Sequence, residues 1–382
     1  MAGATAGALA GIVVADFSRV LAGPYATMLL GDLGARVIKV ERPGAGDDTR
    51  AWGPPWAQDG QSTYFHSVNR NKESLALNLS APEDLAIARN LASRADILIE
   101  NFKPGTMARY GLAYEELRLM NSRLIWCSIT GFGSTAGRDL PGYDLLVQAM
   151  GGLMSITGDD EPTKAGVALV DVLTGLHACV SILGALHHRD RTGQGQAIEV
   201  TLLGTLLSAL VNQASAFVQA GVVSERMGNA HPSIAPYEVY QASDRPIVIA
   251  VGNDAQFARM AQVLDHAELA NDPRFATNPA RVTHRTALNA ALNAALQNRT
   301  ADHWQREFQR VGVPAGPVND IAQAFALAQS LGLDPIRQVE LSSQTSRTVA
   351  HPATFSETSV RYEHSAPTLD ADGDALRREF ST

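Results

Sequence analysis

Asp171 is the residue whose type and setting most clearly indicate chemistry, because it is a single carboxylate between an apolar run and a long apolar segment. Residues 166–170 precede it and Leu173, Leu176 and Ala178 follow, so little water is expected around it. Two compatible roles are open. The carboxylate caps a helix by accepting hydrogen bonds from first-turn N–H groups. Alternatively, it is a nucleophile that the dipole at a helix N-terminus keeps ionised and ready to attack a carbonyl.

Further segments share a pattern with one known family. Their sequences are DFSRVLAGPYATMLLGDLGARVIKVER at 16–42, DILIENFKPGTMARYG at 96–111, SITGFGSTAGRDLPGYD at 128–144 and RTGQGQ at 191–196. Together with the Asp171 stretch, they resemble the class III CoA-transferases, the family that includes formyl-CoA and carnitine CoA-transferases. The resemblance covers nearly the whole chain and keeps the family's order. Residues 46–50 and 226–237 are most similar to the succinyl-CoA:glutarate branch.

The resemblance implies a CoA-transferase that moves CoA from an acyl-CoA donor, expected to be succinyl-CoA, to an acid acceptor, expected to be a short dicarboxylate. Asp171 would attack the donor thioester, giving a mixed anhydride and CoA thiolate, and the thiolate would then form an aspartyl-CoA thioester. Anhydride and thioester have similar acyl-transfer potential, so neither is a deep trap, and an apolar setting protects both from water. The CoA thioester is a substrate, and neither a tightly bound cofactor nor a metal is expected.

The resemblance also assigns the CoA-binding positions residue by residue. The matching positions are Val20, Leu21 and Ala22 in the first CoA-contacting loop, Arg42 after the second strand, Leu77 and Asn78 after the third, Asn101, Phe102 and Lys103 in the NF-x-PG loop, Arg109 near a phosphate, and Tyr143 and Asp144 beside the thioester. Surface charge is the alternative explanation for Arg42, Lys103 and Arg109. Their positions after strand ends favour a ligand role, since parallel sheets bind ligands there.

His231 and Ser233 are the candidates for holding the second carboxylate of a dicarboxylic acceptor, with the backbone of residues 229–235 and a charge from Arg50 or Arg226. Such a carboxylate needs partners, because an unpaired buried charge is very costly. The alternatives are a structural hydrogen-bonding role for His231 and a simple linker role for the segment. The tetraglycine lid of the formyl-CoA transferase branch is not visible here, which makes oxalate a doubtful acceptor.

Three rival functions were weighed against transfer. An α-methylacyl-CoA racemase of the same fold needs a base on each face of the α-carbon, usually from a His-Asp dipeptide, but Tyr143-Asp144 stands here and tyrosine is a poor base at neutral pH. A nucleotide-binding dehydrogenase needs G-x-G-x-x-G after the first strand, and residues 17–24 lack it. A non-catalytic CoA-binding protein would not explain Asp171.

The elements that position these residues alternate between strand-like and helix-like patterns over the first 200 residues. Strands are expected at 11–16, 37–41, 96–100, 124–129 and 197–200, and helices at 24–33, from Pro82, at 114–120 and at 172–188. This alternation predicts an α/β fold, with a Rossmann-like parallel sheet covered by helices on both faces. Asn101, Phe102, Thr130 and Gly131 then follow strand ends.

Two domains are expected from 382 residues. Residues 1–215 are the first part of a large CoA-binding domain, 226–325 form a smaller α/β domain with a strand at 246–251 and helices near 254–265, 281–298 and 301–311, and 330–382 are an irregular tail. The family resemblance implies that this tail returns to the large domain and that two chains form an interlocked homodimer.

Composition narrows the partners. The net charge of −8 argues against nucleic acid, and no stretch of about 18 uninterrupted apolar residues predicts a membrane span. Residues before Leu9 are expected to be a short flexible tag rather than a signal peptide, since no positive n-region precedes them. Cys127 and Cys179 lack disulfide or metal spacing, which indicates buried free thiols in a reducing cytoplasm.

Overall fold

The structure is a computed structural model that describes residues 7–341 and 344–381. The predicted flexible tag before Leu9 falls mainly on residues 1–6, which lie outside the described residues. The described chain divides into two compact units. The first contains the chain up to Leu153, Lys164–Val223 and the chain from Asp334 onward, and the second contains Met154–Thr163 and Ser224–Leu333.

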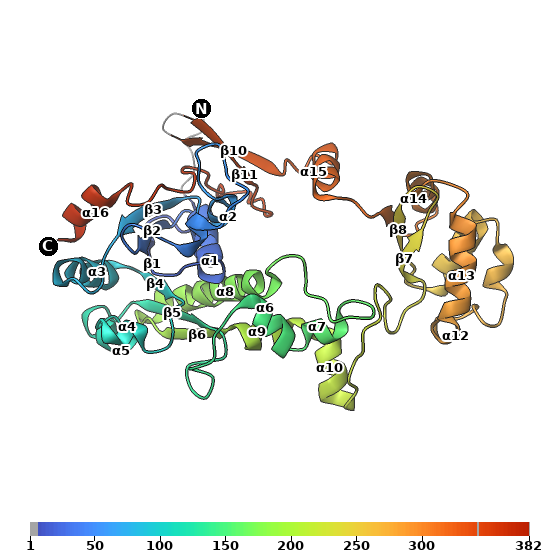
Figure 1. The fold of residues 1–382 in the computed structure, drawn as a ribbon, viewed down its shortest axis with the longest axis horizontal. Coiled ribbons are helices and arrows are strands. Elements are labelled where there is room, and N and C mark those ends of the chain that lie inside the picture. The colour runs from blue at the N-terminus through green and yellow to red at the C-terminus, as the bar shows by residue number, and fades with distance from the viewer. Residues whose placement is uncertain (1–6, 342–343, 382) are drawn as a thin grey trace. The chain divides into compact units, whose positions relative to one another are not determined.

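The first unit contains the large sheet and most of the helices (Figure 1). Its elements are β1 (Val13–Asp16), α1 (Ala22–Asp32), β2 (Arg36–Glu41), the 3₁₀ turn η1 (Asp48–Ala51), α2 (Thr63–Val68), β3 (Lys72–Ala76), α3 (Pro82–Arg94), β4 (Ile97–Glu100), α4 (Thr106–Arg109), α5 (Tyr114–Met120), β5 (Ile125–Thr130), α6 (Asp144–Met150), α8 (Leu169–Thr192), β6 (Ala197–Thr201), α9 (Leu202–Ala209), α10 (Val211–Ala220), β10 (Ile336–Leu341), β11 (Gln344–Val349) and α16 (Gly373–Phe380), while α7 (Leu153–Ile156) crosses the boundary between the units.

The large sheet has the strand order β3-β2-β1-β4-β5-β6, and every neighbouring pair is parallel. This confirms the predicted α/β class with a Rossmann-like sheet. In this order the chain reverses direction across the sheet between β1 and β4, and ligands of such sheets bind at that point, outside the carboxyl ends of the strands. Most predicted boundaries of helices and strands lie within three residues of the observed ones. The main difference that affects the site is that α8 begins at Leu169, whereas the predicted helix begins at residue 172.

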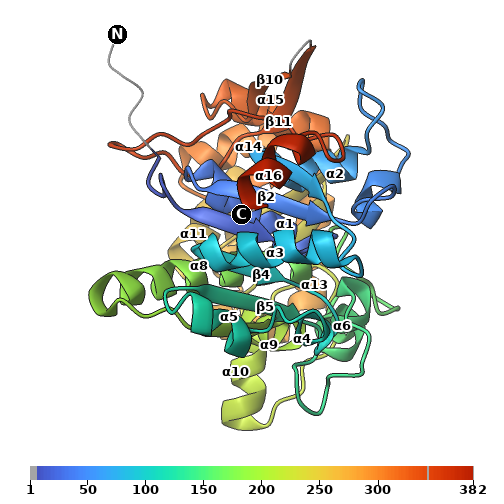
Figure 2. The same ribbon diagram turned by 90° about the vertical axis from the view of Figure 1, so that its left-hand side faces the viewer.

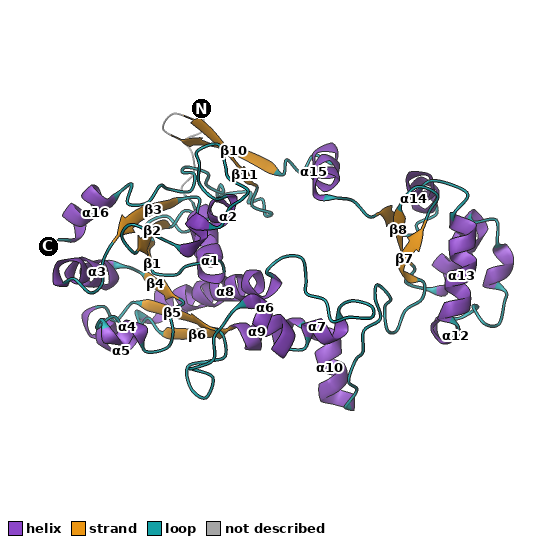
Figure 3. Cartoon of the chain, viewed as in Figure 1, coloured by secondary structure: helices purple, strands orange, loops and turns teal. Residues whose placement is uncertain are grey.

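Helices cover both faces of this sheet (Figures 2 and 3). On one face, buried side chains of β1, β4 and β5 pack with α1 and α8, and the set includes Val14, Ile97, Ile125, Leu30 and Ile182. On the other face, Ala15, Ile38 and Leu98 pack with α3, α5 and α16. Successive residues of a strand point to opposite faces, so runs such as Ile97-Leu98 supply both cores at once.

α1 and α8 approach each other closely on the first face. Gly175 of α8 has no side chain, and a Cβ there would lie 2.6 Å from the carbonyl oxygen of Ala22 at the start of α1. Because Gly175 is one turn after Asp171, this contact brings the start of α8 beside the start of α1. The sequence before α1 and the sequence before α8 therefore meet at one edge of the sheet.

Among the helices of the described chain, α8 is the one that is long and apolar enough to cross a membrane by itself. The helices α9 and α10, which meet at a bend of 84°, meet the same criteria of length and composition when they are taken together. A buried core helix also passes that test, and α8 packs on α1 and the sheet through Val170, Ala178 and Ile182. The core thus accounts for the buried apolar residues of α8, while others on the same helix, such as Leu176 and Val180, are exposed.

The second unit is built on a small antiparallel sheet of order β7-β8-β9. Its elements are β7 (Tyr237–Gln241), β8 (Pro246–Ala250), α11 (Asp254–Val263), the 3₁₀ turn η2 (Ala267–Ala270), α12 (Asn278–Thr283), α13 (Arg285–Leu296), α14 (Ala301–Arg310), β9 (Ala315–Pro317) and α15 (Ile321–Ser330). Its core includes Ile249, Phe257, Leu292 and Phe308. The segment 281–298, expected as one helix, is divided at His284 into α12 and α13.

The prediction of an irregular C-terminal tail is wrong for its described part, since this region forms the β10–β11 hairpin and α16. The chain from Asp334 onward belongs to the first unit, the one that contains the large sheet. The carboxylates of Asp372 and Asp370 accept hydrogen bonds from the backbone N–H groups of Ser74 and Ala76 on β3 (2.9 and 2.8 Å). These two carboxylates provide hydrogen-bond acceptors for backbone N–H groups of the edge strand β3. The sequence of a Ser- and Thr-rich tail does not reveal such contacts.

Candidate active site

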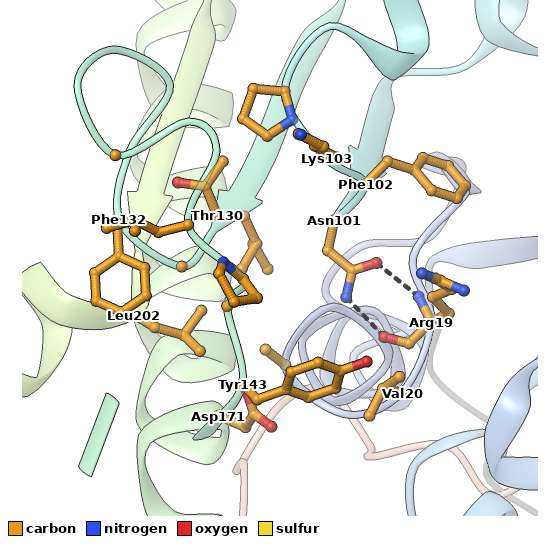
Figure 4. A pocket seen from close by; sticks show the side chains of 18 of the residues that line it. Arg19, Val20, Asn101, Phe102, Lys103, Thr130, Phe132, Tyr143, Asp171 and Leu202 are labelled. Atoms are coloured by element: carbon orange, nitrogen blue, oxygen red, sulfur yellow. Dashed lines mark hydrogen bonds between the residues drawn. The ribbon is translucent and has the colours of Figure 1, made fainter. Parts of the chain in front are cut away.

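A cavity of about 640 Å³ lies at the carboxyl ends of β1, β4 and β5 (Figure 4). Its walls are the loops that follow these three strands, together with the start of α1 and the start of α8. Of the residues predicted from the sequence, it is lined by Val20, Leu21, Ala22, Asn101, Phe102, Lys103, Tyr143 and Asp171. The structure therefore brings eight predicted residues from four distant segments to one place, at the topological switch point of the sheet.

Asp171 is the third residue of α8 and not its N-cap, so the prediction that it caps the helix is wrong. Ala168 occupies the N-cap position, and Asp171 lies half-buried on the cavity wall beside Tyr143 (Figure 4). Burial, followed by the negative charge of Asp144, raises the pKa of Asp171 to about 7. Burial and the like charge of Asp144 thus oppose the ionised form of Asp171, which the dipole at a helix N-terminus was expected to favour.

Asp144 is the group that caps α8. Its Oδ1 accepts hydrogen bonds from the backbone N–H groups of Val170 (2.8 Å) and Asp171 (3.2 Å). Its Oδ2 accepts one from Nε2 of Gln148 (2.6 Å), and Oε1 of Gln148 accepts the N–H of Ala165 (2.9 Å). Asp144 is not among the residues that line the cavity. Its neighbour Tyr143 does line it and is well exposed.

The loop after β1 is fixed by side chains from other strands. Oδ1 of Asn101 accepts the N–H of Arg19 (2.9 Å) and its Nδ2 donates to the Arg19 carbonyl (2.7 Å), as the dashed lines in Figure 4 show. Val20 has a positive φ of 70°, and its N–H points to the Asp47 carboxylate (3.2 and 3.3 Å). A β-branched residue is strained there, so these two partners hold the loop in a shape it would not adopt alone.

The loop leads into α1, whose start lines the cavity at Leu21 and Ala22. Leu21 stands at the N-cap position, and no side chain of the described chain caps this helix. The first N–H groups of a helix lack partners within the helix, and they lie at the positive end of its dipole. This wall is therefore suited to an oxygen anion, whether a phosphate or a developing oxyanion.

A second cavity, of about 250 Å³, is lined by the residues after β1, β2 and β3. It contains the predicted Arg42, Leu77 and Asn78, and it shares Arg19 and Phe102 with the first cavity. Asp48 forms ion pairs with Arg19 (2.9 Å) and Arg42 (2.6 Å). Two guanidinium groups are thus held near the junction of the two cavities, although only Arg42 was predicted.

Two other predicted cations are placed differently. Lys103 lines the large cavity and forms an exposed ion pair with Asp139 (2.9 Å). Arg109 is exposed at the end of α4 and is not among the residues that line either cavity. The sequence signal for Arg19 was present in the DFSRVLAGP segment, where it directly precedes Val20.

The predicted acceptor residues His231 and Ser233 belong to the second unit, where Nδ1 of His231 accepts the N–H of Ser233 (3.1 Å). Arg226 donates to the carbonyls of Asp159 and Asp160 within the same unit. Arg50 belongs to the first unit and is paired with Glu41 (2.7 Å). The role of these residues toward the acceptor stays a prediction.

A buried charge network next to the smaller cavity was not predicted from the sequence. Lys39 pairs with Asp47 (2.9 Å) and Lys72 pairs with Asp16 (3.1 Å), and all four side chains are buried. Burial opposes ionisation of Asp47, yet Lys39 beside it keeps the pKa of Asp47 below its usual value. The sequence signal was limited to Lys39, which stands among the apolar residues Val37, Ile38 and Val40 of β2, whereas Lys72 begins β3 next to the polar Glu73 and Ser74. Charges at such positions need partners.

The arrangement defines a class of protein: an α/β enzyme with one half-buried carboxylate at the switch point of a Rossmann-like sheet. No group of three or more His, Cys, Asp or Glu side chains suited to a metal occurs among residues 7–341 and 344–381. Cys127 and Cys179 are buried and unpaired with each other, so neither is a disulfide partner in the described chain.

Comparison with known proteins gives the family. The sequence model of CoA-transferase family III matches residues 9–373. The chain is 44% identical to the succinate–glutarate CoA-transferase of Agrobacterium fabrum, over 98% of this chain and 96% of that protein. It is 43% identical to the acetyl-CoA:oxalate CoA-transferase of Acetobacter aceti, with 97% and 95% covered. This chain belongs to CoA-transferase family III, and it is a transferase whose substrates are CoA thioesters.

A solved structure agrees with this conclusion. The crystal structure of a CAIB/BAIF family protein from Brucella suis has a TM-score of 0.88 to this chain at 42% identity, with 97% of this chain and 99% of that chain covered. The agreement extends over both units of the chain.

Proposed function

We propose that this protein transfers CoA from succinyl-CoA to a short dicarboxylic acid through covalent intermediates on Asp171. The observation that carries the proposal is a half-buried carboxylate on the wall of a large cavity, beside the uncapped start of α1. A carboxylate there has little water to compete with it, and the N–H groups of Leu21 and Ala22 can stabilise the oxyanion of a tetrahedral intermediate.

The chemistry then runs in balanced steps. The Asp171 carboxylate adds to the donor thioester carbonyl and CoA thiolate leaves, giving the aspartyl-acyl anhydride. The thiolate attacks the aspartyl carbonyl and the donor acid leaves, giving the aspartyl-CoA thioester. The acceptor carboxylate repeats the first step, and the thiolate finally takes the acceptor acyl group and frees Asp171.

The two cavities supply a path for CoA. The smaller one has the apolar Val40, Leu77 and Phe102 among its lining residues, which suits an adenine ring. Arg19 and Arg42, held by Asp48, are the phosphate-binding candidates, since guanidinium groups bind phosphate strongly. The pantetheine arm then passes through the larger cavity to Asp171.

The racemase alternative has less support, because both carboxylate oxygens of Asp144 accept hydrogen bonds from α8 and Gln148. The group that would accompany Tyr143 as a base is thus engaged elsewhere. α-Proton exchange of 2-methylacyl-CoA with solvent deuterium, at rates comparable to CoA transfer, would restore that alternative.

The acceptor is the less supported part of the proposal, since the names of two relatives of almost equal identity specify glutarate in one and oxalate in the other. We choose a dicarboxylic acid of four to six carbons, because residues 46–50 and 226–237 resemble the glutarate branch. The test is a mass-spectrometric screen of succinyl-CoA against glutarate, valerate, oxalate, formate and carnitine. A site that pairs the distal carboxylate accepts glutarate and rejects valerate strongly.

Equal activity on glutarate and valerate, or a preference for oxalate, formate or carnitine, contradicts the acceptor assignment. The covalent part has its own test, which is trapping with hydroxylamine during incubation with succinyl-CoA. Modification of Asp171 supports the nucleophile assignment, and transfer without modification there contradicts it.

A further inference from the structure

Asp144 connects α6 to the start of α8. Its Oδ1 receives the N–H groups of Val170 and Asp171, and its Oδ2 receives the amide of Gln148, which also holds the N–H of Ala165 ahead of α8. The Asp144 carboxylate thus joins three parts of the chain around the cavity. They are the end of the loop that contains Tyr143, the segment ahead of α8, and the first turn of α8, which carries Asp171.

These contacts have two consequences for Asp171. The N–H groups of residues 170 and 171 are occupied by Asp144 and cannot donate to the Asp171 carboxylate. In addition, a fixed negative charge is held next to the first turn of α8. Both effects make the Asp171 carboxylate a stronger base, and a more basic oxygen is a better nucleophile toward a thioester carbonyl.

We infer that Asp144 is a positioning residue for the transfer reaction: it fixes the start of α8 and sets the basicity of the Asp171 carboxylate by its own charge. The inference rests on the proposed role of Asp171 as nucleophile. It adds a function to Asp144 that differs from the thioester contact expected from the sequence, since Asp144 acts through the helix and not through the substrate.

Other charged and titratable groups face the same cavity and must be separated from Asp144. Tyr64 on α2 interacts electrostatically with Asp171, but burial raises its pKa to about 12, so it stays neutral in the working range. The remaining charged and titratable groups on the wall are Tyr143, Arg19, Asp48, Lys103, Arg138 and Asp139. Arg19 is paired with Asp48, and Lys103 is paired with Asp139. Arg138 directly precedes Asp139 in the same loop, and none of these groups belongs to α8.

The test compares Asp144→Asn with the wild type in single-turnover acylation by succinyl-CoA, measured as CoA thiol release between pH 5 and 9. Asparagine keeps an acceptor oxygen for the α8 N–H groups but removes the charge. In a plot of the acylation rate against pH, we expect the rate to rise with a midpoint near pH 7 in the wild type. In Asp144→Asn this midpoint should be lower by on the order of one pH unit. The plateau rate falls, because a less basic carboxylate attacks more slowly.

Asp190→Asn is the matched control, since Asp190 is an exposed carboxylate near the far end of the same helix. It should leave the midpoint and the plateau unchanged. Asp144→Ser is the second variant, because serine is a neutral helix cap and tests the charge again should the asparagine variant not fold. Asp144→Ala removes charge and cap, so it should share the lower midpoint and also melt at a lower temperature.

The outcomes separate the two ideas. Hydroxylamine modification of Asp171 with a lowered midpoint in Asp144→Asn and Asp144→Ser supports the inference. Modification of Asp171 with an unchanged midpoint in both variants overturns it and leaves the proposed function intact. Acylation that does not involve Asp171 in the wild type overturns both.

Discussion

At the residue scale, the ionisation of Asp171, the proposed nucleophile, affects the stability of the fold as well as the proposed chemistry. The ordinary pKa of an Asp side chain is 3.8, and burial with the Asp144 charge raises that of Asp171 to about 7. In the unfolded chain the group ionises near pH 4, so between these values the folded state binds a proton that the unfolded state has lost. Stability from this residue therefore falls as pH rises from about 4 to 7 and is constant above that.

The first prediction concerns Asp171→Asn. We expect transfer to fall by roughly 10³-fold or more, because no nucleophile remains. We expect the variant to be more stable than the wild type above pH 7, since it carries no desolvated charge, and the gain should shrink toward pH 4. Transfer assays and urea unfolding at pH 4.5, 6 and 8 measure both effects. Near-normal transfer, or a stability gain that grows on acidification, would contradict the assignment.

The second prediction concerns the buried pair beneath the loop after β1. Asp47→Ala leaves Lys39 buried without its closest carboxylate and removes the acceptor for the Val20 N–H, so we expect a loss of about 3–5 kcal/mol in unfolding free energy. Asp48→Ala, one residue on, is the matched control. Its ion pairs with Arg19 and Arg42 are partly exposed, and we expect less than about 1 kcal/mol. Equal losses in urea titrations would refute the distinction.

At the element scale, the site depends on how closely α1 and α8 pack. A helical Gly→Ala change usually stabilises a protein by up to about 1 kcal/mol. At Gly175 the added Cβ would lie 2.6 Å from the Ala22 carbonyl oxygen and 3.1 Å from the Tyr25 ring, so the two helices must separate. Since Asp171 and the start of α1 face the same cavity, this separation changes the distance from the proposed nucleophile to the N–H groups proposed to bind the oxyanion.

The third prediction follows from this contact. Gly175→Ala should destabilise the protein by about 1–3 kcal/mol, as overpacked cores do, and should slow acylation of Asp171. Gly166→Ala is the control, because a Cβ there meets nothing within 4 Å and Gly166 lies just ahead of α8. We expect its stability to change by less than about 0.5 kcal/mol. A stabilising effect of Gly175→Ala in thermal melts would show that the helices are not in close contact.

At the scale of the whole molecule, the order of strands and helices could be predicted from the sequence because parallel strands are apolar runs between amphipathic helices. Strand ends then located Asn101, Phe102 and Lys103 correctly on the cavity wall. The tail could not be predicted in this way. Its contacts with distant residues include those of Asp370 and Asp372, just ahead of α16, with Ser74 and Ala76, and that of Thr348 on β11 with Arg70. Periodicity within the tail carries no trace of these partners.

For the site, too, the sequence could predict some features and not those that depend on contacts between distant segments. The sequence located Asp171 at a helix start, but its exact turn and its pKa depend on Asp144, which is 27 residues away in the chain and meets α8 only after folding. The buried pairs of Lys39 and Lys72 were likewise hidden, because their partners come from other strands and loops. Local patterns identify chemistry-bearing residues, and tertiary contacts decide what each of them does.

The last prediction concerns assembly. Large apolar side chains are exposed on α8, α9 and α10, with exposed fractions of 66% at Val180, 50% at Leu207 and 60% at Phe217. Exposed apolar side chains on three helices of one unit favour an interface with another subunit. We propose the interlocked homodimer that the family resemblance implies, and we expect light scattering to give twice the chain mass of 40.7 kDa.

Two variants and one exchange experiment test this assembly. Val180→Asp together with Phe217→Asp should prevent the dimer from forming when the chain is refolded, whereas Leu119→Asp, at an 81% exposed apolar position on α5, should not. Interlocked chains cannot part without unfolding, so dimers carrying two different tags should exchange no subunits under native conditions and should mix fully after joint unfolding and refolding. A monomer at micromolar concentration contradicts the dimer, and rapid native exchange contradicts the interlocking, because separable subunits would then be held only by their surfaces.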